Sequence, residues 1–278
     1  MINRRQKVKN ISAIIILAIL TGCVFKNKNN NPRKKALKSL TIYVSNINDS
    51  GKEVHKYVDE RIDYDLKGHI ASHLWYRNSA CLDMANYYTY DSAGREVQDI
   101  FIVDNAVDDV TEIKYNRWDS VSEYINHNTG LNGGTSSTTY MFYDSNRNHI
   151  EDSAVFSNGE LYYIDRFYFN KAGKCVKNIR TGRDGQNQYT VLYYYDSHNR
   201  ETKEWSTGNM NGDWETRYDN LGRDTEEVAI SSLNHDFWWL YTFAYDNSNR
   251  KKTKIQYNKY EDRPKHPYKI WHYVYEDR

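Results

Sequence analysis

The 278-residue sequence has only three prolines and three cysteines. So few cysteines exclude a small scaffold held together by several disulfides. Outside one apolar run near the N-terminus, apolar residues do not recur at helical spacing, which excludes a mainly helical fold. Disorder is excluded as well, because aromatic residues make up 15% of the chain and tyrosine alone accounts for 26 residues.

Acidic residues are missing from the first 38 positions, which carry ten lysines and arginines. The rest of the chain therefore holds 28 basic against 37 acidic residues, a net charge of −9. Binding to nucleic acid requires clustered basic side chains that neutralise phosphates. The acidic body is thus not expected to bind nucleic acid.

Residues 1–22 have the three parts of a secretion signal. Four basic residues precede an apolar run from Ile11 to Leu20, which is about half the ~20 residues that cross a bilayer as a helix. The run ends in Leu-Thr-Gly-Cys, which resembles the lipobox of bacterial lipoproteins. The resemblance implies that Cys23 becomes the acylated N-terminus, and several acyl chains on one cysteine anchor a protein stably. The alternative is a secreted protein in which Cys23 follows the signal by chance.

Residues 23–38 contain six basic residues and an asparagine run, which is typical of a flexible tether whose charges sit on anionic head groups. Val24 stands where an Asp retains enterobacterial lipoproteins in the inner membrane, and the tether lacks the acidic run associated with surface export in some Bacteroidetes. We therefore expect a lipid-anchored protein of a bacterial outer membrane, with the periplasmic side favoured over the cell surface.

One sequence motif recurs through residues 39–278, for example as Tyr-Thr-Tyr-Asp-Ser-Ala-Gly-Arg from position 88. Nine aromatic anchors mark its copies at intervals of 23 to 30 residues. These repeat anchors are Tyr64, Tyr90, Tyr115, Tyr143, Phe169, Tyr195, Tyr218, Tyr245 and Tyr275. A degenerate first copy is read at residues 46–54, and the end of the chain truncates the last copy.

Each copy is interpreted as a β-hairpin. The residue two before the anchor is apolar or aromatic in eight of nine copies, as in a strand with one buried face. Asp or Asn follows most anchors and accepts hydrogen bonds in turns, and three residues later stands a residue that tolerates a left-handed backbone. The predicted turn residues are Asp65, Gly68, Asp91, Gly94, Asp144, Gly173, Asp196, Asn199, Asp219, Gly222, Asp246 and Asn249. Arg147 breaks this rule, and a shift of register onto Asn146 or Asn148 would restore it.

The predicted fold is all-β, an array of about nine β-hairpin repeats that forms one coiled or curled antiparallel sheet over residues 39–278. Twisted sheets of more than about ten strands must coil, close or split. A propeller with two hairpins per blade is less favoured, because odd and even copies show no consistent difference. Cys81 and Cys175 lie 94 residues apart and are expected to be free and buried.

The motif aromatic-Asp-x-x-Gly-Arg resembles the YD repeat of the Rhs family and is complete at Tyr90–Arg95 and Tyr218–Arg223. The resemblance covers about residues 40–278. In large members of the family such repeats curl into a hollow β-shell around a toxic C-terminal domain. Here the resemblance implies a β-hairpin fold and a cell-envelope setting. It implies no catalytic activity, because no toxin-like sequence follows the last repeat.

The sequence predicts no enzyme, metal site or cofactor. His69 and His73 lie on one face of a strand more than about 12 Å apart, too far for shared metal ligation. The Gly-rich stretch 129–135 lacks the Lys-Ser/Thr of a phosphate-binding loop, and no serine stands in a nucleophile motif. The turn aspartates are better explained as hydrogen-bond acceptors of their own turns than as calcium ligands.

Aromatic residues of the C-terminal third are the candidate ligand-binding residues: Trp205, Trp214, Trp238, Trp239, Tyr241 and Trp271. Alternation along a strand places Trp239 and Tyr241 on one face and Trp238 on the other. Rings on a sheet face can stack on sugars. The alternative is that these rings form the core of the repeat array.

We therefore predict a non-enzymatic, lipid-anchored envelope protein whose sheet serves as a scaffold or protein-binding surface. The alternative is a carbohydrate-binding module that uses the Trp and Tyr residues of the C-terminal repeats. The expected partners are the membrane, through lipidated Cys23, and a protein or polysaccharide of the envelope.

Overall fold

The structure is a computed structural model that describes residues 36–78, 80–129, 134–208, 212–231, 238–259 and 266–277. Ala36–Arg278 form one compact unit. The predicted signal peptide, Cys23 and almost all of the tether lie outside the described residues.

The described residues contain 18 β-strands and no helix. The strands are β1 (Leu37–Ile47), β2 (Glu53–Tyr64), β3 (Ile70–Asn78), β4 (Cys81–Tyr90), β5 (Glu96–Val103), β6 (Ala106–Tyr115), β7 (Val121–Asn128), β8 (Ser137–Tyr143), β9 (His149–Phe156), β10 (Leu161–Phe169), β11 (Cys175–Gly182), β12 (Asn187–Tyr195), β13 (Glu201–Gly208), β14 (Gly212–Tyr218), β15 (Asp224–Ser231), β16 (Trp238–Tyr245), β17 (Lys251–Lys259) and β18 (His266–Asp277).

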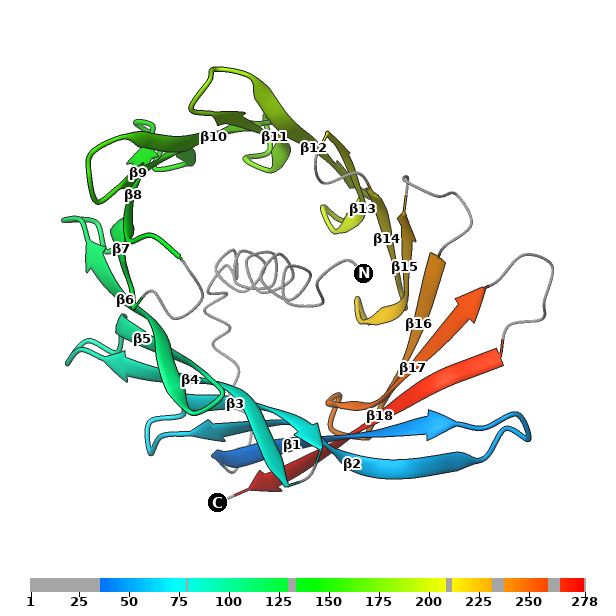
Figure 1. The fold of residues 1–278 in the computed structure, drawn as a ribbon. Coiled ribbons are helices and arrows are strands. Elements are labelled where there is room, and N and C mark those ends of the chain that lie inside the picture. The colour runs from blue at the N-terminus through cyan, green and yellow to red at the C-terminus, as the bar shows by residue number, and fades with distance from the viewer. Residues whose placement is uncertain are drawn as a thin grey trace. The chain divides into compact units, whose positions relative to one another are not determined.

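Each strand pairs antiparallel with the next strand along the chain, and β1 pairs with β18, so the sheet closes into a single β-barrel (Figure 1). The prediction of an all-β hairpin array is therefore confirmed, but the sheet does not end as an open coil. β18 carries the ninth anchor, and β1 pairs with it where the second strand of the hairpin pairs in the other repeats, with Leu40 opposite Tyr275. Closure leaves no unpaired sheet edge.

Eight connections of identical length lie at one end of the barrel, which we call the turn rim. Each follows a repeat anchor and spans five residues: 65–69, 91–95, 116–120, 144–148, 170–174, 196–200, 219–223 and 246–250. The other end, the loop rim, carries the remaining connections, which vary from two to eight residues in length. The segment interpreted as a degenerate first copy forms a turn at residues 48–52, and this turn belongs to the loop rim.

Within a turn, the aspartate holds the backbone. Asp219 Oδ1 accepts hydrogen bonds from the backbone N–H of Leu221 at 2.8 Å and of Arg223 at 3.0 Å. Gly222 then adopts φ +77°, which an L-residue reaches only at a cost. The predicted register shift in the fourth copy is wrong, because Arg147 itself adopts φ +66°. Its N–H still donates to the Asp144 carbonyl at 3.0 Å, so the turn is kept despite the unfavourable residue.

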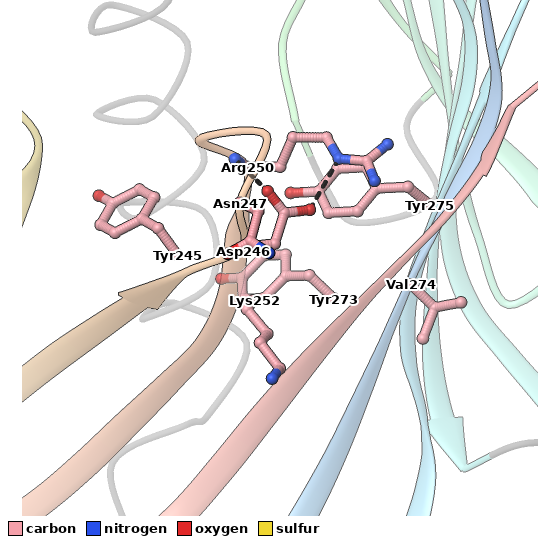
Figure 2. Close-up of a pocket in the computed structure, with 8 residues that line it drawn as sticks. All are labelled: Tyr245, Asp246, Asn247, Arg250, Lys252, Tyr273, Val274 and Tyr275. Carbon is pink, nitrogen blue, oxygen red and sulfur yellow. Dashed lines mark hydrogen bonds and ion pairs between the residues drawn. The ribbon is translucent and has the colours of Figure 1, made fainter. Parts of the chain in front are cut away.

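Neighbouring repeats are joined by the anchor and the motif arginine. Tyr218 Oη donates to the Glu201 carbonyl of the preceding repeat at 2.5 Å. The same bond to the preceding repeat is made at 2.6–2.9 Å by Tyr90, Tyr115, Tyr143, Tyr195, Tyr245 and Tyr275. In return, the arginine of one repeat covers the next anchor. Arg250 bonds to Asp246 of its own turn and lies 4.4 Å from the centre of the Tyr275 ring (Figure 2).

The anchors and the alternate residues before them form the inner wall of the barrel, where side chains converge. Trp271 Nε1 of β18 donates to Asp59 Oδ2 of β2 at 2.8 Å, across the intervening β1. On the opposite face, the outer wall, Tyr168 and Tyr194 are 45% and 47% exposed. Inward and outward residues alternate along a barrel strand, and Figure 2 shows this for β18, where Val274 points away from Tyr273 and Tyr275.

The two remaining cysteines are free, as expected. The expectation that both are buried is wrong for Cys81, which is exposed. Cys81 begins β4 immediately after a two-residue connection of the loop rim, where neighbouring strands give little cover. Cys175 lies opposite the anchor Phe169 and is partly covered.

Candidate functional site

Three aromatic side chains from alternate strands meet on the inner wall. The ring centres of Trp214 of β14 and Tyr241 of β16 are 6.3 Å apart, and those of Tyr241 and Trp271 of β18 are 6.4 Å apart. Ala229 of β15 pairs with Trp214 and Trp239, so a small side chain lies between large ones. We call Trp214, Tyr241 and Trp271 the inner aromatic strip.

Charged groups surround the strip. Lys254 Nζ lies 4.0 Å from the centre of the Tyr241 ring and 5.7 Å from that of Trp271. Burial lowers the pKa of Lys254, and nearby Glu227 partly opposes this effect. Burial raises the pKa of Glu227. It also raises the pKa of Asp59, although the hydrogen bond from Trp271 works against the rise. An ammonium group near aromatic faces is attracted to the rings.

This arrangement combines aromatic rings with polar groups: Asp59 bonds to the edge of the Trp271 ring, and the Lys254 ammonium group lies over the Tyr241 ring. A pyranose ring has the matching character, since its C–H face is apolar and its hydroxyl groups lie around the edge. The planes of Trp214 and Tyr241 are inclined by 29° and those of Tyr241 and Trp271 by 59°. The strip is therefore a row of rings at different tilts on alternate strands, which suits an extended chain of sugars better than one small molecule. Trp214 is 38% exposed, so one end of the row is accessible to a ligand.

The structure separates the aromatic residues that the sequence grouped together. Trp214, Tyr241 and Trp271 come together on the inner wall, and Trp239 is on the same wall by its pairing with Ala229. Trp205 pairs with Leu192 and belongs to the outer wall, 38% exposed. The side chain of Trp238 lies outside what the structure describes.

Sequence reasoning missed the charged members of the site. Lys254 and Glu227 occupy inward positions of strands that neighbour the strip, which their alternation relative to the anchors Tyr245 and Tyr218 would have indicated. Asp59 reaches the site only because the barrel closes, and no local pattern signals that.

Two carboxyl pairs elsewhere on the inner wall have perturbed acidity. Burial raises the pKa of Glu96 and of Glu201 to about 7 each, and repulsion from Asp99 and Glu204 adds to the effect. Burial and the charge of Asp109 raise the pKa of Asp99 to about 6. Such shifts are common at functional sites. Glu96 and Glu201, however, occupy the same repeat position, opposite the anchors Tyr90 and Tyr195, so the repeat geometry itself accounts for them.

The outer wall carries ion pairs between neighbouring strands. Their N–O distances are 2.9 Å for Lys114–Glu123, 2.9 Å for Arg166–Glu151, and 2.8 Å for Arg217–Glu226. These charges point outward along with apolar neighbours such as Ile164 and Leu192. The outer wall is therefore mixed in polarity.

A shallow hollow of about 420 Å³ lies at the turn rim, lined by Tyr245, Arg250 and Tyr275 among others (Figure 2). It is open to the surface and already holds the contacts that join two repeats. Among the described residues, no three His, Cys, Asp or Glu side chains are grouped to hold a metal ion. Within the same residues no helix is long and apolar enough to span a membrane.

No protein-family model matches the chain, and no curated protein matches it. Among solved structures, the chain is similar to a porin-like protein from Bacteroides uniformis ATCC 8492, with a TM-score of 0.46 and 9% identity over 88% of this chain and 99% of that one. It is also similar to TcdB2-TccC3-TEV, with a TM-score of 0.38 and 11% identity over 82% of this chain and 14% of that one. A third similar structure is TcdB2-TccC3 without its hypervariable C-terminal region, with a TM-score of 0.39 and 11% identity over 79% of this chain and 15% of that one. All three TM-scores are below 0.5 and all three identities are 11% or less, so these similarities do not indicate a function.

Proposed function

We propose that the protein is a non-enzymatic, lipid-anchored barrel of the bacterial cell envelope that binds a glycan chain along the inner aromatic strip. The observation that carries this proposal is the row formed by Trp214, Tyr241 and Trp271, with the charged groups Lys254 and Asp59 beside the rings. The membership in YD-repeat proteins suggested by the motif is part of the same proposal.

The polarity of the outer wall supports a barrel that stands outside the bilayer. Membrane-spanning barrels present an apolar band about 25 Å tall to lipid, and a lysine or arginine at its middle costs about 2–4 kcal/mol. The outer wall instead carries ion pairs along its strands, from Lys114–Glu123 near the turn rim to Lys203–Glu215 at the middle of β14. A lipid on Cys23 would then supply the attachment to the membrane.

A protein-binding scaffold remains the second proposal, but closure of the barrel weakens it. A scaffold built from strands can bind partners by adding a strand at a free edge. The pairing of β1 with β18 removes that edge. A protein partner would have to use the rims or the outer wall.

The test compares two tryptophans of equal exposure on opposite walls. Trp214 and Trp205 are each 38% exposed. We expect Trp214→Ala in the mature chain, solubilised in detergent, to weaken binding of envelope polysaccharide at least tenfold by isothermal titration calorimetry. Trp205→Ala should bind like the unchanged protein. An equal loss of affinity in both variants would refute the proposal, as would the absence of glycan binding by the unchanged protein. Capture of a saturable protein partner instead would favour the scaffold.

The non-enzymatic part is tested separately. Incubation with the bound polysaccharide should leave its chain length unchanged by size-exclusion chromatography. New reducing ends that disappear in a Glu227→Gln variant would contradict this part of the proposal, because a carboxyl group beside the strip would then take part in cleavage.

A further inference from the structure

The tips of the turn rim have a composition unlike the rest of the barrel. The second and third residues of the eight turns include no acidic side chain. Leu66, Trp118 and Leu221 stand there with exposed fractions of 89%, 41% and 69%. Basic residues accompany them in the same turns, including Lys67 and Arg117. Large exposed apolar side chains beside lysine and arginine are typical of surfaces that enter the membrane interface.

The acids of the turn rim are bonded within the rim, although the Asp119 side chain is 79% exposed. Asp65, Asp219 and their equivalents accept backbone hydrogen bonds of their own turns. Asp119 is bonded at 2.7 Å to Arg95 of the neighbouring turn. The charge presented outward by the tips is therefore basic, which suits anionic head groups.

Trp118 is flanked by arginines from two turns. The guanidinium carbon of Arg117 lies 4.6 Å from the centre of its ring, and that of Arg147 lies 6.0 Å away. Arg147 occupies a left-handed position that Gly, Asn or Asp fills in the other turns. An arginine there costs backbone energy, and strained residues that persist commonly serve a function. Here the strained residue places a cation beside the one tryptophan of the turn rim.

The chain also enters the barrel at this rim. Leu37 begins β1 opposite Asp277, the last residue of β18. Thirteen residues separate Cys23 from Leu37, and a segment of that length spans at most about 45 Å when fully extended. A lipid on Cys23 would therefore keep the turn rim close to the bilayer surface.

The loop rim lacks these features in its described connections. Residues 48–52, 104–105, 157–160 and 183–186 together contain four acids and two bases, and no large apolar side chain. Acidic, polar loops gain nothing from an anionic lipid surface. Within the described residues, the connections of the two rims thus differ in apolar content and in charge.

We propose that the turn rim is a membrane-docking surface that rests on anionic lipid head groups through Leu66, Trp118 and Leu221. The inference rests on the lipid-anchored part of the proposed function and is independent of glycan binding. Docking holds the barrel axis upright, with the loop rim directed away from the bilayer.

The experiment uses the chain from residue 23 onward with Cys23→Ser, so that no lipid contributes to binding. Its partition onto vesicles of phosphatidylglycerol and phosphatidylcholine is measured by cosedimentation. The test variant carries Leu66→Ser, Trp118→Ser and Leu221→Ser. The control variant carries Val107→Ser, Tyr162→Ser and Tyr268→Ser, which remove exposed apolar side chains from strand ends nearest the loop rim, with exposed fractions of 38%, 47% and 48%. Circular dichroism checks that all three proteins fold.

We expect the test variant to lose at least tenfold in partition and the control variant to stay within twofold of the parent. Equal partition of parent and test variant would overturn the proposal. So would an equal loss in the control, since the binding would then not be confined to the turn rim. If the test variant does not fold, the single Leu66→Ser variant replaces it, because this side chain is 89% exposed. We then expect its partition to fall at least twofold. An unchanged partition would contradict the proposal. Failure of acylation at Cys23, seen by mass spectrometry of the native protein, would refute the lipid anchor without affecting this measurement.

Discussion

The two rims of the barrel are built from the same strands but obey different rules. Every connection of the turn rim has five residues, whereas those of the loop rim range from two to eight. At the turn rim each turn must place an aspartate, a left-handed residue and an anchor so that the next repeat can bond to it. The described loop-rim connections also bond to the preceding repeat, as in Asp104 N–H to the Asp83 carbonyl at 3.1 Å and Ser157 N–H to the Ser136 carbonyl at 3.0 Å. These bonds occur in connections of two and four residues, so they do not fix the length, and the repeat interval varies with it. A repeat protein can therefore hold its fold with one rim and keep the other free to change.

The largest expected effect comes from breaking the turn length. Insertion of Gly-Ser after Asn220 separates Asp219 from the backbone groups that it bonds. The same insertion after Gly134 lengthens the longest loop, where doubling the length costs only about 0.6 kcal/mol. We expect the first insertion to lower the Tm by roughly 5 °C or more and the second by under about 2 °C. Equal effects in thermal unfolding would mean that the rims do not differ.

The second prediction concerns pH and contrasts two acids of one repeat. Hydrogen bonds from the backbone and from Arg200 lower the pKa of Asp196 to about 2, so its contribution to stability is present above about pH 4 and is lost below that. Burial raises the pKa of Glu201 to about 7, so Glu201 favours the folded state below about pH 4.5 and this contribution is lost as the pH rises to 7. We expect the Tm to be higher at pH 5 than at pH 8.

Glu201→Gln should reduce that difference and raise the Tm at pH 8, because no buried charge then forms. Glu96→Gln, at the same position of another repeat, should act in the same way. A Tm that rises from pH 5 to pH 8, or a slope that neither variant changes, would show that these carboxyl groups are not buried as described.

The third prediction tests the bond between repeats. Tyr218→Phe removes the hydrogen bond to the Glu201 carbonyl and should cost about 1 kcal/mol in free energy of unfolding. Tyr194→Phe, on the outer wall where the ring is 47% exposed, should cost nearly nothing. Phe169 is the one anchor without a hydroxyl group, so Phe169→Tyr should stabilise the protein by a similar amount. Urea unfolding of the three variants measures this, and an unchanged Tyr218→Phe would contradict it.

The smallest effect is expected at Arg147. Its φ of +66° is unfavourable for an arginine and easy for a glycine, so Arg147→Gly should stabilise the protein by up to about 1 kcal/mol. The same substitution should weaken vesicle binding, since a cation beside Trp118 is lost. A variant that is less stable than the parent would place Arg147 in a structural role instead.

The strands and turns could be predicted from the sequence because each depends on residues close together in the chain. The anchor, the aspartate and the left-handed residue lie within five positions, and their chemistry fixes the turn. Closure could not be predicted, because it depends on the twist summed over all strands and on the pairing of Leu40 with Tyr275, at opposite ends of the chain.

The candidate site was predictable only in part for the same reason. Alternation along one strand placed Trp239 and Tyr241 on a common face. It did not say which face is inward, nor that Trp205 and Trp214 of neighbouring strands point to opposite walls, since that depends on the register between β13 and β14. Asp59 joins Trp271 only across the closure of the barrel.

Hydrogen exchange of the acylated protein on vesicles tests the contrast between the rims most directly. Amides of 66–67, 117–118 and 220–221 should be protected on phosphatidylglycerol vesicles relative to detergent, whereas those of 49–51, 158–159 and 184–185 should exchange equally in both. Protection of the loop rim instead, or of neither rim, would contradict the account.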